Sequence, residues 1–154
     1  MSDCTLRVEA VERTERPVRM RMPFRYGVVT LREAPQSFLE VRVRDASGRT
    51  ATGFAADLLA PKWFDKSPDL SNEENFEQLR RAVALASARY MDTRDYLSPF
   101  ALHALHDGPL HDEAAAEGLN GLVAGFGNGC LDRAVFDAAC RLDEGIGIAE
   151  WVAR

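Results

Sequence analysis

Three histidines in one short segment have the spacing closest to that of a metal site. His103 and His106 are three positions apart, so on a helix they would share a face, and zinc can bind such a pair. His111 follows Gly108-Pro109, which we expect to interrupt the helix, and no cysteine lies close by in the sequence. We therefore expect these histidines to face solvent or cap a helix, and a small zinc enzyme stays open as the less favoured hypothesis.

A glycine-rich run, Gly125-Phe126-Gly127-Asn128-Gly129, is the next candidate, because glycine loops can cradle phosphates. A dinucleotide site needs such glycines between a strand and a helix, followed by a second strand and an acidic residue. Here the glycines alternate with other residues, and only three apolar residues precede them. No second strand is predicted after the glycines. We interpret the glycines as small residues that allow helices to pack closely.

Nucleophiles and acids also lack the partners that catalysis needs. Cys130 and Cys140 have no histidine nearby in the sequence and lie among small apolar residues, which predicts buried structural thiols. Together with Cys4 they make an odd, unpatterned set, which predicts reduced thiols. Asp137 lies in an apolar stretch, where an acid is usually paired or binds a backbone group. We predict no catalytic residue and no metal ligand in this chain.

Composition predicts a single cytoplasmic domain. The chain has 154 residues, of which 46% are hydrophobic and 28% charged, and this is ordinary globular usage. The net charge of −5 argues against a nucleic-acid or anionic-membrane partner. No apolar run is long enough to span a membrane, and the N-terminus lacks the apolar core of a signal peptide.

Alternating apolar residues predict three strands in the first part of the chain. Leu39, Val41 and Val43 alternate with charged residues, residues 45–48 supply a turn, and residues 49–56 form the return strand. Earlier alternation, over 5–13 and again over 18–22 beyond a kink at Pro17, predicts the first strand. Residues 23–27 then form a loop. Short links between the strands imply an antiparallel meander.

From residue 71 onward the apolar period becomes helical. Ser71 and Glu74 fit a capping box before a helix over about residues 72–92. A weaker helical region covers 98–117, broken near Gly108-Pro109, and a last helix covers 119–142. The apolar stripe of that helix is Leu131, Ala134, Val135, Ala138 and Leu142. The prediction is an α+β domain, a three-stranded antiparallel meander followed by a helical bundle that packs on one face of the sheet.

Three local strings occur in an order typical of one known family. They are RMPFRYG at residues 21–27, LEVRV at 39–43 with glycines at 48 and 53, and LDRAVFDAA at 131–139. In this order they resemble the N-terminal capping domain of the enolase superfamily, in the mandelate racemase and muconate lactonising enzyme branch. Two departures are Phe54, where an acidic residue commonly follows the hairpin glycine, and Phe136, where the family has a tryptophan.

The resemblance implies that catalysis and substrate selection lie on different domains. In that superfamily a (β/α) barrel holds magnesium on three carboxylates, and its bases abstract a proton α to a substrate carboxylate. The capping domain closes the barrel mouth with two loops that shape substrate specificity, here residues 23–30 and 55–66. The site residues implied by this mapping are Phe24, Arg25, Tyr26, Lys62, Trp63 and Phe64. The aromatic side chains would form apolar walls, and one of the two cations would meet a substrate carboxylate.

A barrel of eight βα units needs about 250 residues, far more than follow the last predicted helix. We therefore expect residues 1–144 to be the capping domain and 145–154 an exit segment toward an absent barrel, which would hold the magnesium and the bases. The chain would be an excised or truncated, non-catalytic part of a lyase or isomerase (a racemase, dehydratase or cycloisomerase). Its partner would be a C-terminal barrel domain or a barrel-bearing chain, and homo-oligomerisation stays open. The alternative is a stand-alone α+β binding or scaffold module.

Overall fold

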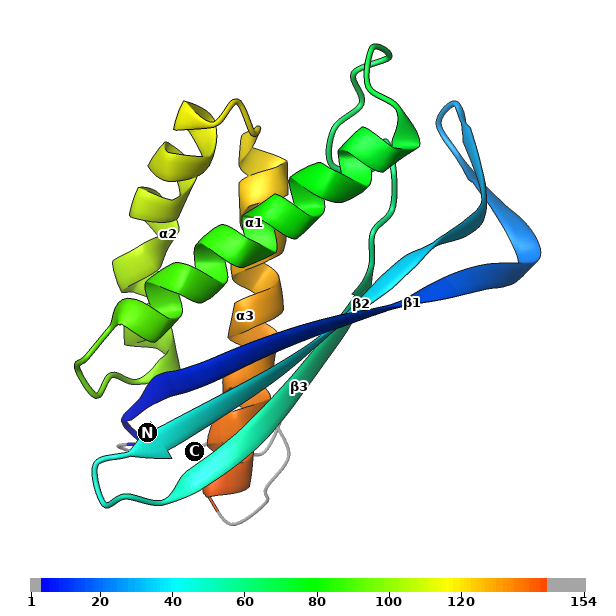
Figure 1. The fold of residues 1–154 in the computed structure, drawn as a ribbon. Coiled ribbons are helices and arrows are strands. Elements are labelled where there is room, and N and C mark those ends of the chain that lie inside the picture. Colours follow the sequence, from blue (N-terminus) through cyan, green and yellow to red (C-terminus); the bar gives the residue numbers. More distant parts are fainter. Residues whose placement is uncertain (1–3, 144–154) are drawn as a thin grey trace.

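Three strands precede three helices in the computed structural model, which describes residues 4–143. The elements are β1 (Leu6–Tyr26), β2 (Val29–Asp45), β3 (Thr50–Leu58), α1 (Asn72–Asp92), α2 (Pro99–Ala116) and α3 (Gly121–Leu142). The strands form one antiparallel sheet in the order β1-β2-β3, with the helices gathered on one side of it (Figure 1). The predicted α+β meander and helical bundle are confirmed. The predicted exit segment, residues 145–154, lies outside the described residues.

β1 and β2 are longer than the sequence pattern predicted. β1 runs through Pro17 and through the predicted loop to a two-residue turn at Gly27-Val28, so the loop prediction at residues 23–26 was wrong. Proline is tolerated here because β1 is an edge strand. β3 pairs only with residues 36–44 of β2. Residues 16–35 therefore project as a two-stranded ribbon, which we call the arm (Figure 1).

The core lies between the sheet and α3. Leu39, Val41 and Val43 of β2 are buried, as their alternation predicted. All five residues of the predicted α3 stripe are buried as well. The capping box of α1 is confirmed, because Ser71 Oγ accepts a hydrogen bond from Glu74 N at 3.2 Å and the Glu74 carboxylate accepts one from Ser71 N at 2.6 Å.

β3 and α3 approach so closely that one contact excludes any side chain. A Cβ atom at Gly53 would lie 2.1 Å from the carbonyl oxygen of Ala134 and 2.3 Å from the backbone nitrogen of Ala138. At the same contact Asp137 accepts a hydrogen bond from the backbone nitrogen of Phe54 at 2.9 Å. The predicted role of Asp137, binding a backbone group, is confirmed.

The glycine run of α3 serves helix packing at one position. A Cβ atom at Gly127 would lie 2.3 Å from the carbonyl oxygen of Ala82 in α1, so only glycine fits there. At Gly125 and Gly129 a Cβ atom would meet nothing within 4 Å. The close-packing interpretation is thus confirmed at Gly127 alone.

α2 is continuous, so the predicted break at Gly108-Pro109 was wrong. Proline costs a helix one hydrogen bond, to the carbonyl four residues earlier. Pro109 is exposed and Leu105 is 49% exposed, so water can reach the carbonyl that loses its partner. Pro109 therefore destabilises the helix less than a buried proline would, because water can replace the lost hydrogen bond.

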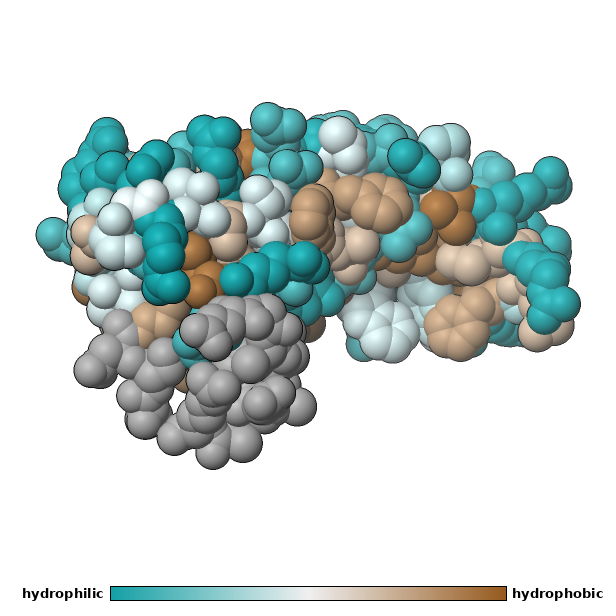
Figure 2. All heavy atoms as spheres, turned by 90° about the horizontal axis from the view of Figure 1, so that it is seen from below, coloured by the Kyte–Doolittle hydropathy of each residue, from teal (hydrophilic) through white to brown (hydrophobic). Residues whose placement is uncertain are grey.

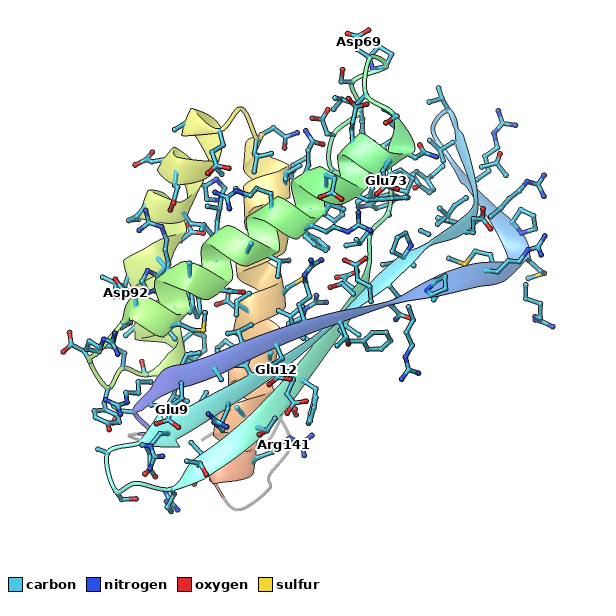
Figure 3. The ribbon with its side chains drawn as sticks, viewed as in Figure 1. Glu9, Glu12, Asp69, Glu73, Asp92 and Arg141 are labelled. Carbon is cyan, nitrogen blue, oxygen red and sulfur yellow. The ribbon has the colours of Figure 1, made fainter. Side chains whose placement is uncertain are left out.

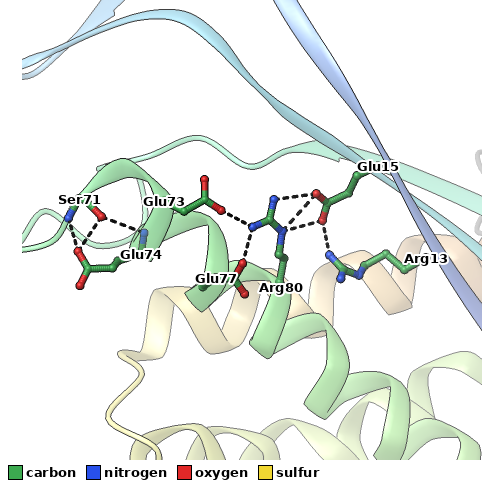
Figure 4. A network of polar contacts seen from close by, with 7 residues as sticks. All are labelled: Arg13, Glu15, Ser71, Glu73, Glu74, Glu77 and Arg80. Carbon is green, nitrogen blue, oxygen red and sulfur yellow. Dashed lines mark hydrogen bonds and ion pairs between the residues drawn. The ribbon is translucent and has the colours of Figure 1, made fainter.

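An ion-pair network ties α1 to β1 (Figure 4). The guanidinium of Arg80 donates to the carboxylate of Glu15 at 2.9 Å, to Glu73 at 2.7 Å and to Glu77 at 2.6 Å. Arg13 contacts the same Glu15 carboxylate. The hydrogen bonds from Arg80 lower the pKa of Glu15, against the smaller opposing effect of burial.

Replacing Gly53 with alanine should destabilise the domain by about 1–3 kcal/mol or more, because backbone must move to admit the Cβ atom. The matched control is Gly125→Ala, at an exposed helical position with open space, which should stabilise by up to about 1 kcal/mol. Urea denaturation of both variants measures the difference. Equal effects would contradict the close approach of β3 and α3.

Glu15→Gln should lower stability at pH 7 by about 1–2 kcal/mol, because a partly buried charge-assisted hydrogen bond is lost. The folded-state pKa of Glu15 lies below its unfolded value, so its contribution is complete above the unfolded pKa of about 4.5 and disappears as pH falls through the folded pKa. The difference from wild type should therefore shrink by pH 3 in urea titrations. Glu12→Gln, at an exposed position without an ion pair to residues 4–143, should change little at either pH.

Candidate functional site

The two predicted specificity segments meet at one end of the molecule. The hydroxyl of Tyr26, beside the turn of the arm, donates to the carbonyl oxygen of Pro61 at 2.7 Å. The Tyr26 ring packs edge-on against Trp63, with centroids 5.2 Å apart, and lies 5.5 Å from the Phe24 ring. The structure thus joins residues that are more than 30 positions apart.

Two hollows flank this aromatic contact. The first, of about 350 Å³, lies between the arm turn and the segment after β3, and its lining residues are Tyr26, Gly27, Val28, Val29, Lys62, Trp63 and Lys66. We call it the loop hollow. The second, of about 300 Å³, brings together all four predicted aromatic residues, Phe24, Tyr26, Trp63 and Phe64. Phe64 also packs on Phe126 of α3, with centroids 4.9 Å apart, and so anchors the segment to the core.

Apolar side chains around these hollows are exposed. Val28 is 94% exposed, Phe24 56% and Trp63 52%, and we call these three residues the apolar tip. Apolar side chains also extend toward the arm in the view from below (Figure 2). Exposed apolar side chains gathered at one place typically mark an interaction or binding surface.

The two predicted cations differ in what they contact. The ammonium of Lys62 donates to the carbonyl oxygen of Ser67 at 2.7 Å and also to that of Leu70. Its backbone has a positive φ of 61°, and its backbone nitrogen donates to Asn75. Lys62 therefore holds the segment before α1 in place. Arg25 is exposed and makes no ion pair with residues 4–143, so its guanidinium is available to an external anion.

A polar cluster between the helices is the second candidate site. The hydroxyl of Tyr90 lies 2.6 Å from Asp132 Oδ1 and 2.7 Å from Asn128 Oδ1, and His103 Nδ1 lies 2.9 Å from Asp132 Oδ2. Burial and the bond to Asp132 raise the pKa of Tyr90, which keeps its hydroxyl protonated. Tyr90 was not among the residues that the sequence predicted to do chemistry. A tyrosine in a buried stripe is itself a signal, because its hydroxyl needs a partner.

The histidines and cysteines considered as candidates do not come together into a metal or catalytic site among residues 4–143. His106 is buried and bonds Thr93 Oγ1 at 2.7 Å, so the expectation that all three histidines face solvent or cap a helix was wrong for His106. Residues 4–143 contain no group of three or more side chains that could hold a metal, and the three-histidine zinc hypothesis therefore finds no support.

Cys130 and Cys140 are buried as predicted, and burial raises the pKa of the Cys130 thiol to about 11. None of the described helices could cross a membrane.

Comparison with known proteins identifies the fold. No model of a known protein family and no curated protein sequence matches the chain. A mandelate racemase/muconate lactonizing enzyme-like protein from Rubrobacter xylanophilus is similar over 94% of this chain, at 20% identity and a TM-score of 0.60. An enolase from Bradyrhizobium, complexed with magnesium and mandelic acid, is similar over 97% of it, at 18% identity and a TM-score of 0.57. A magnesium-bound enolase from an alphaproteobacterium, BAL199, is similar over 90% of it, at 17% identity and a TM-score of 0.56.

The chain spans about a third of the length of these proteins, 33%, 35% and 32% of the respective chains. At such identities the similarity shows the fold. The chain has the fold of their N-terminal capping domain.

Lys62→Met should make residues 62–70 more sensitive to proteolysis, about tenfold or more, because two carbonyl contacts that hold this segment are lost. Lys66→Met removes an exposed ammonium that makes no hydrogen bond or ion pair with residues 4–143, and it should leave the cleavage rate unchanged. Limited proteolysis with mass spectrometry compares the two. If the cleavage rate of Lys62→Met equalled that of the wild type, the structural role of Lys62 would be contradicted, and Lys62 would again be a candidate cation for ligand binding.

Proposed function

We propose that this chain is the substrate-specificity capping domain of a metal-dependent enzyme of the enolase superfamily, in the mandelate racemase and muconate lactonising enzyme branch. The observation that carries the proposal is the meeting of residues 23–30 and 55–66 at one end, through the Tyr26–Pro61 and Tyr26–Trp63 contacts. The sequence resemblance assigns lid roles to these same two segments, and the fold of the chain agrees with it.

The chemistry would take place on a (β/α) barrel, either a C-terminal domain or a separate chain in the cytoplasm. Among residues 4–143 no group of three side chains could hold a metal ion, so we place the magnesium ligands on the barrel. The reaction would begin with abstraction of a proton α to a substrate carboxylate and continue as a racemisation, dehydration or cycloisomerisation. In this proposal the bases lie on the barrel, and residues 4–143 act through binding and not through proton transfer. It would select the substrate and exclude water from the barrel mouth.

The contacts at the arm turn indicate which residues would meet the apolar part of a substrate and which would meet its carboxylate. The Tyr26 hydroxyl and the Lys62 ammonium are already bonded within the chain, so the loop hollow offers mainly ring faces and aliphatic surface. Tyr26 and Trp63 would contact an apolar part of the substrate. Arg25, which has no partner within residues 4–143, would be the cation that meets a carboxylate. The exposed apolar tip also disfavours the alternative of a stand-alone module with a closed polar surface.

The test joins this chain to a barrel of that branch, fused or mixed, with magnesium present. Exchange of the α-proton of 2-hydroxycarboxylates in deuterated water, followed by NMR, should occur in the combined protein and not with this chain alone. Trp63→Ala should lower kcat/KM by about tenfold or more for substrates with a bulky apolar group and little for small ones. Leu105→Ala, an exposed position on α2, should leave both values unchanged. Exchange by the chain alone, or an equal loss for every substrate, would refute the proposal.

A further inference from the structure

The loop hollow contains a positively charged side chain that the described part of the chain does not use. Two lysines, Lys62 and Lys66, line the hollow beside the rings of Tyr26 and Trp63. The Lys62 ammonium donates to two backbone carbonyl oxygens and has a structural role. Lys66 is exposed, and its ammonium makes no hydrogen bond or ion pair with residues 4–143. The ammonium of Lys66 is therefore available to a ligand in the hollow.

The acidic residues described at this end of the molecule do not line the hollow. Figure 3 labels two of them, Asp69 before α1 and Glu73 in its first turn. The Glu73 carboxylate accepts a hydrogen bond from Arg80 at 2.7 Å. The carboxylate of Asp65, next to Lys66 in the sequence, accepts hydrogen bonds from a backbone nitrogen at 2.9 Å and from a glutamine amide at 3.0 Å. The charge of Lys66 is thus not paired with a carboxylate of residues 4–143.

The rest of the lining of the loop hollow is mainly apolar. Val28 and Trp63 are exposed beside it, and the hydroxyl of Tyr26 is bonded to a backbone carbonyl, so Tyr26 offers its ring. The volume of about 350 Å³ is near the lower end of the range for ligand sites, roughly 300–1,000 Å³. A single ring or a short branched chain suits such a volume. An anion on that apolar group would complement both the walls and Lys66.

Arg25, the other available cation, lies outside this hollow. It stands between Phe24 and Tyr26 in β1, and successive residues of a strand point to opposite faces of the sheet. Accordingly Arg25 is not among the residues that line either hollow. A carboxylate that meets Arg25 and an anion that meets Lys66 therefore occupy different places. A substrate that meets both carries two anionic groups.

We propose that Lys66 determines specificity at the loop hollow by pairing with a second anionic group, carried on the apolar part of the substrate. This inference rests on the proposed function and deepens it, because it narrows the substrates to carboxylic acids with a distal anion. Closure over a barrel would exclude water from the hollow, and an ammonium without a partner is costly to bury. A substrate with a neutral distal group leaves Lys66 unpaired and binds more weakly.

Binding of a small anion to the chain alone tests the hollow without a barrel. The chain has two tryptophans, so in a Trp151→Phe background the fluorescence reports on Trp63. At constant ionic strength, benzoate should bind about tenfold or more tightly than benzamide, its neutral isostere, because its hydrogen bond to Lys66 is charge-assisted. Lys66→Met should remove this difference, and Lys66→Arg should keep most of it. Arg94→Met, which removes an exposed cation after α1, should change neither affinity.

Three results in the chain alone would overturn the inference. They are equal affinities for benzoate and benzamide, no change in the Trp63 fluorescence with either probe, and a benzoate affinity that Lys66→Met leaves unchanged. Limited proteolysis of Lys66→Met, with the wild-type cleavage rate expected, shows that a lost affinity does not come from a rearranged segment.

The combined protein with magnesium separates the inference from the proposed function. A 2-hydroxycarboxylate whose phenyl ring carries a second carboxylate should exchange its α-proton with a kcat/KM about tenfold or more above that of the matched ring amide. Lys66→Met should abolish this preference and leave the value for the amide unchanged. Exchange without a preference for the ring carboxylate would overturn the inference and leave the proposed function standing. Absence of exchange with both substrates would contradict the proposed function, and the assignment of a substrate class with it, even where benzoate still binds the hollow.

Discussion

The close approach of α3 to both of its neighbours is the constraint on which the rest of the structure depends. Gly53 lets the backbone of β3 touch α3, and Gly127 lets α3 touch α1. Asp137 strengthens the first contact, because its carboxylate accepts a hydrogen bond from the backbone nitrogen of Phe54. Packed cores do not deform continuously, so these two contacts set the height of the sheet below α3 and the position of α1 beside it. The ion pair between Glu15 and Arg80 then fastens β1 to the helix that α3 has positioned.

That packing also explains where the molecule is left uncovered. The helices cover the part of the sheet that includes β3, and β3 ends its pairing at Gln36 of β2. Beyond this point the arm has only its own two strands. The segment between β3 and α1 turns back to the arm turn through Tyr26 and is held in shape by Lys62. The candidate site therefore lies at the edge of the core, on a rigid support, where side chains can meet a ligand or another protein.

Satisfied and unsatisfied polar groups separate the structural residues from the candidates for binding. Between the helices, Tyr90 and His103 both bond Asp132, and such a cluster stabilises packing without needing a ligand. At the arm turn the opposite holds, because Trp63 and Val28 are exposed and Arg25 has no partner among residues 4–143. By the same criterion Lys62 has a structural role in this conformation. Its ammonium is already occupied by backbone carbonyls.

The sequence by itself determined the order and kind of the elements, because side-chain period and capping chemistry are local. The alternation around Val41, the capping box at Ser71 and the buried stripe of α3 needed no knowledge of distant residues, and even Asp137 was identified by its apolar neighbours. Only the tertiary structure decided that β1 continues through residues 23–26, that Pro109 continues a helix and that His106 is buried. Each outcome depends on what lies opposite that residue in space, an open sheet edge, solvent or another helix. The meeting of Tyr26 with Trp63 was decided in the same way, because a contact between distant segments follows from packing and not from spacing.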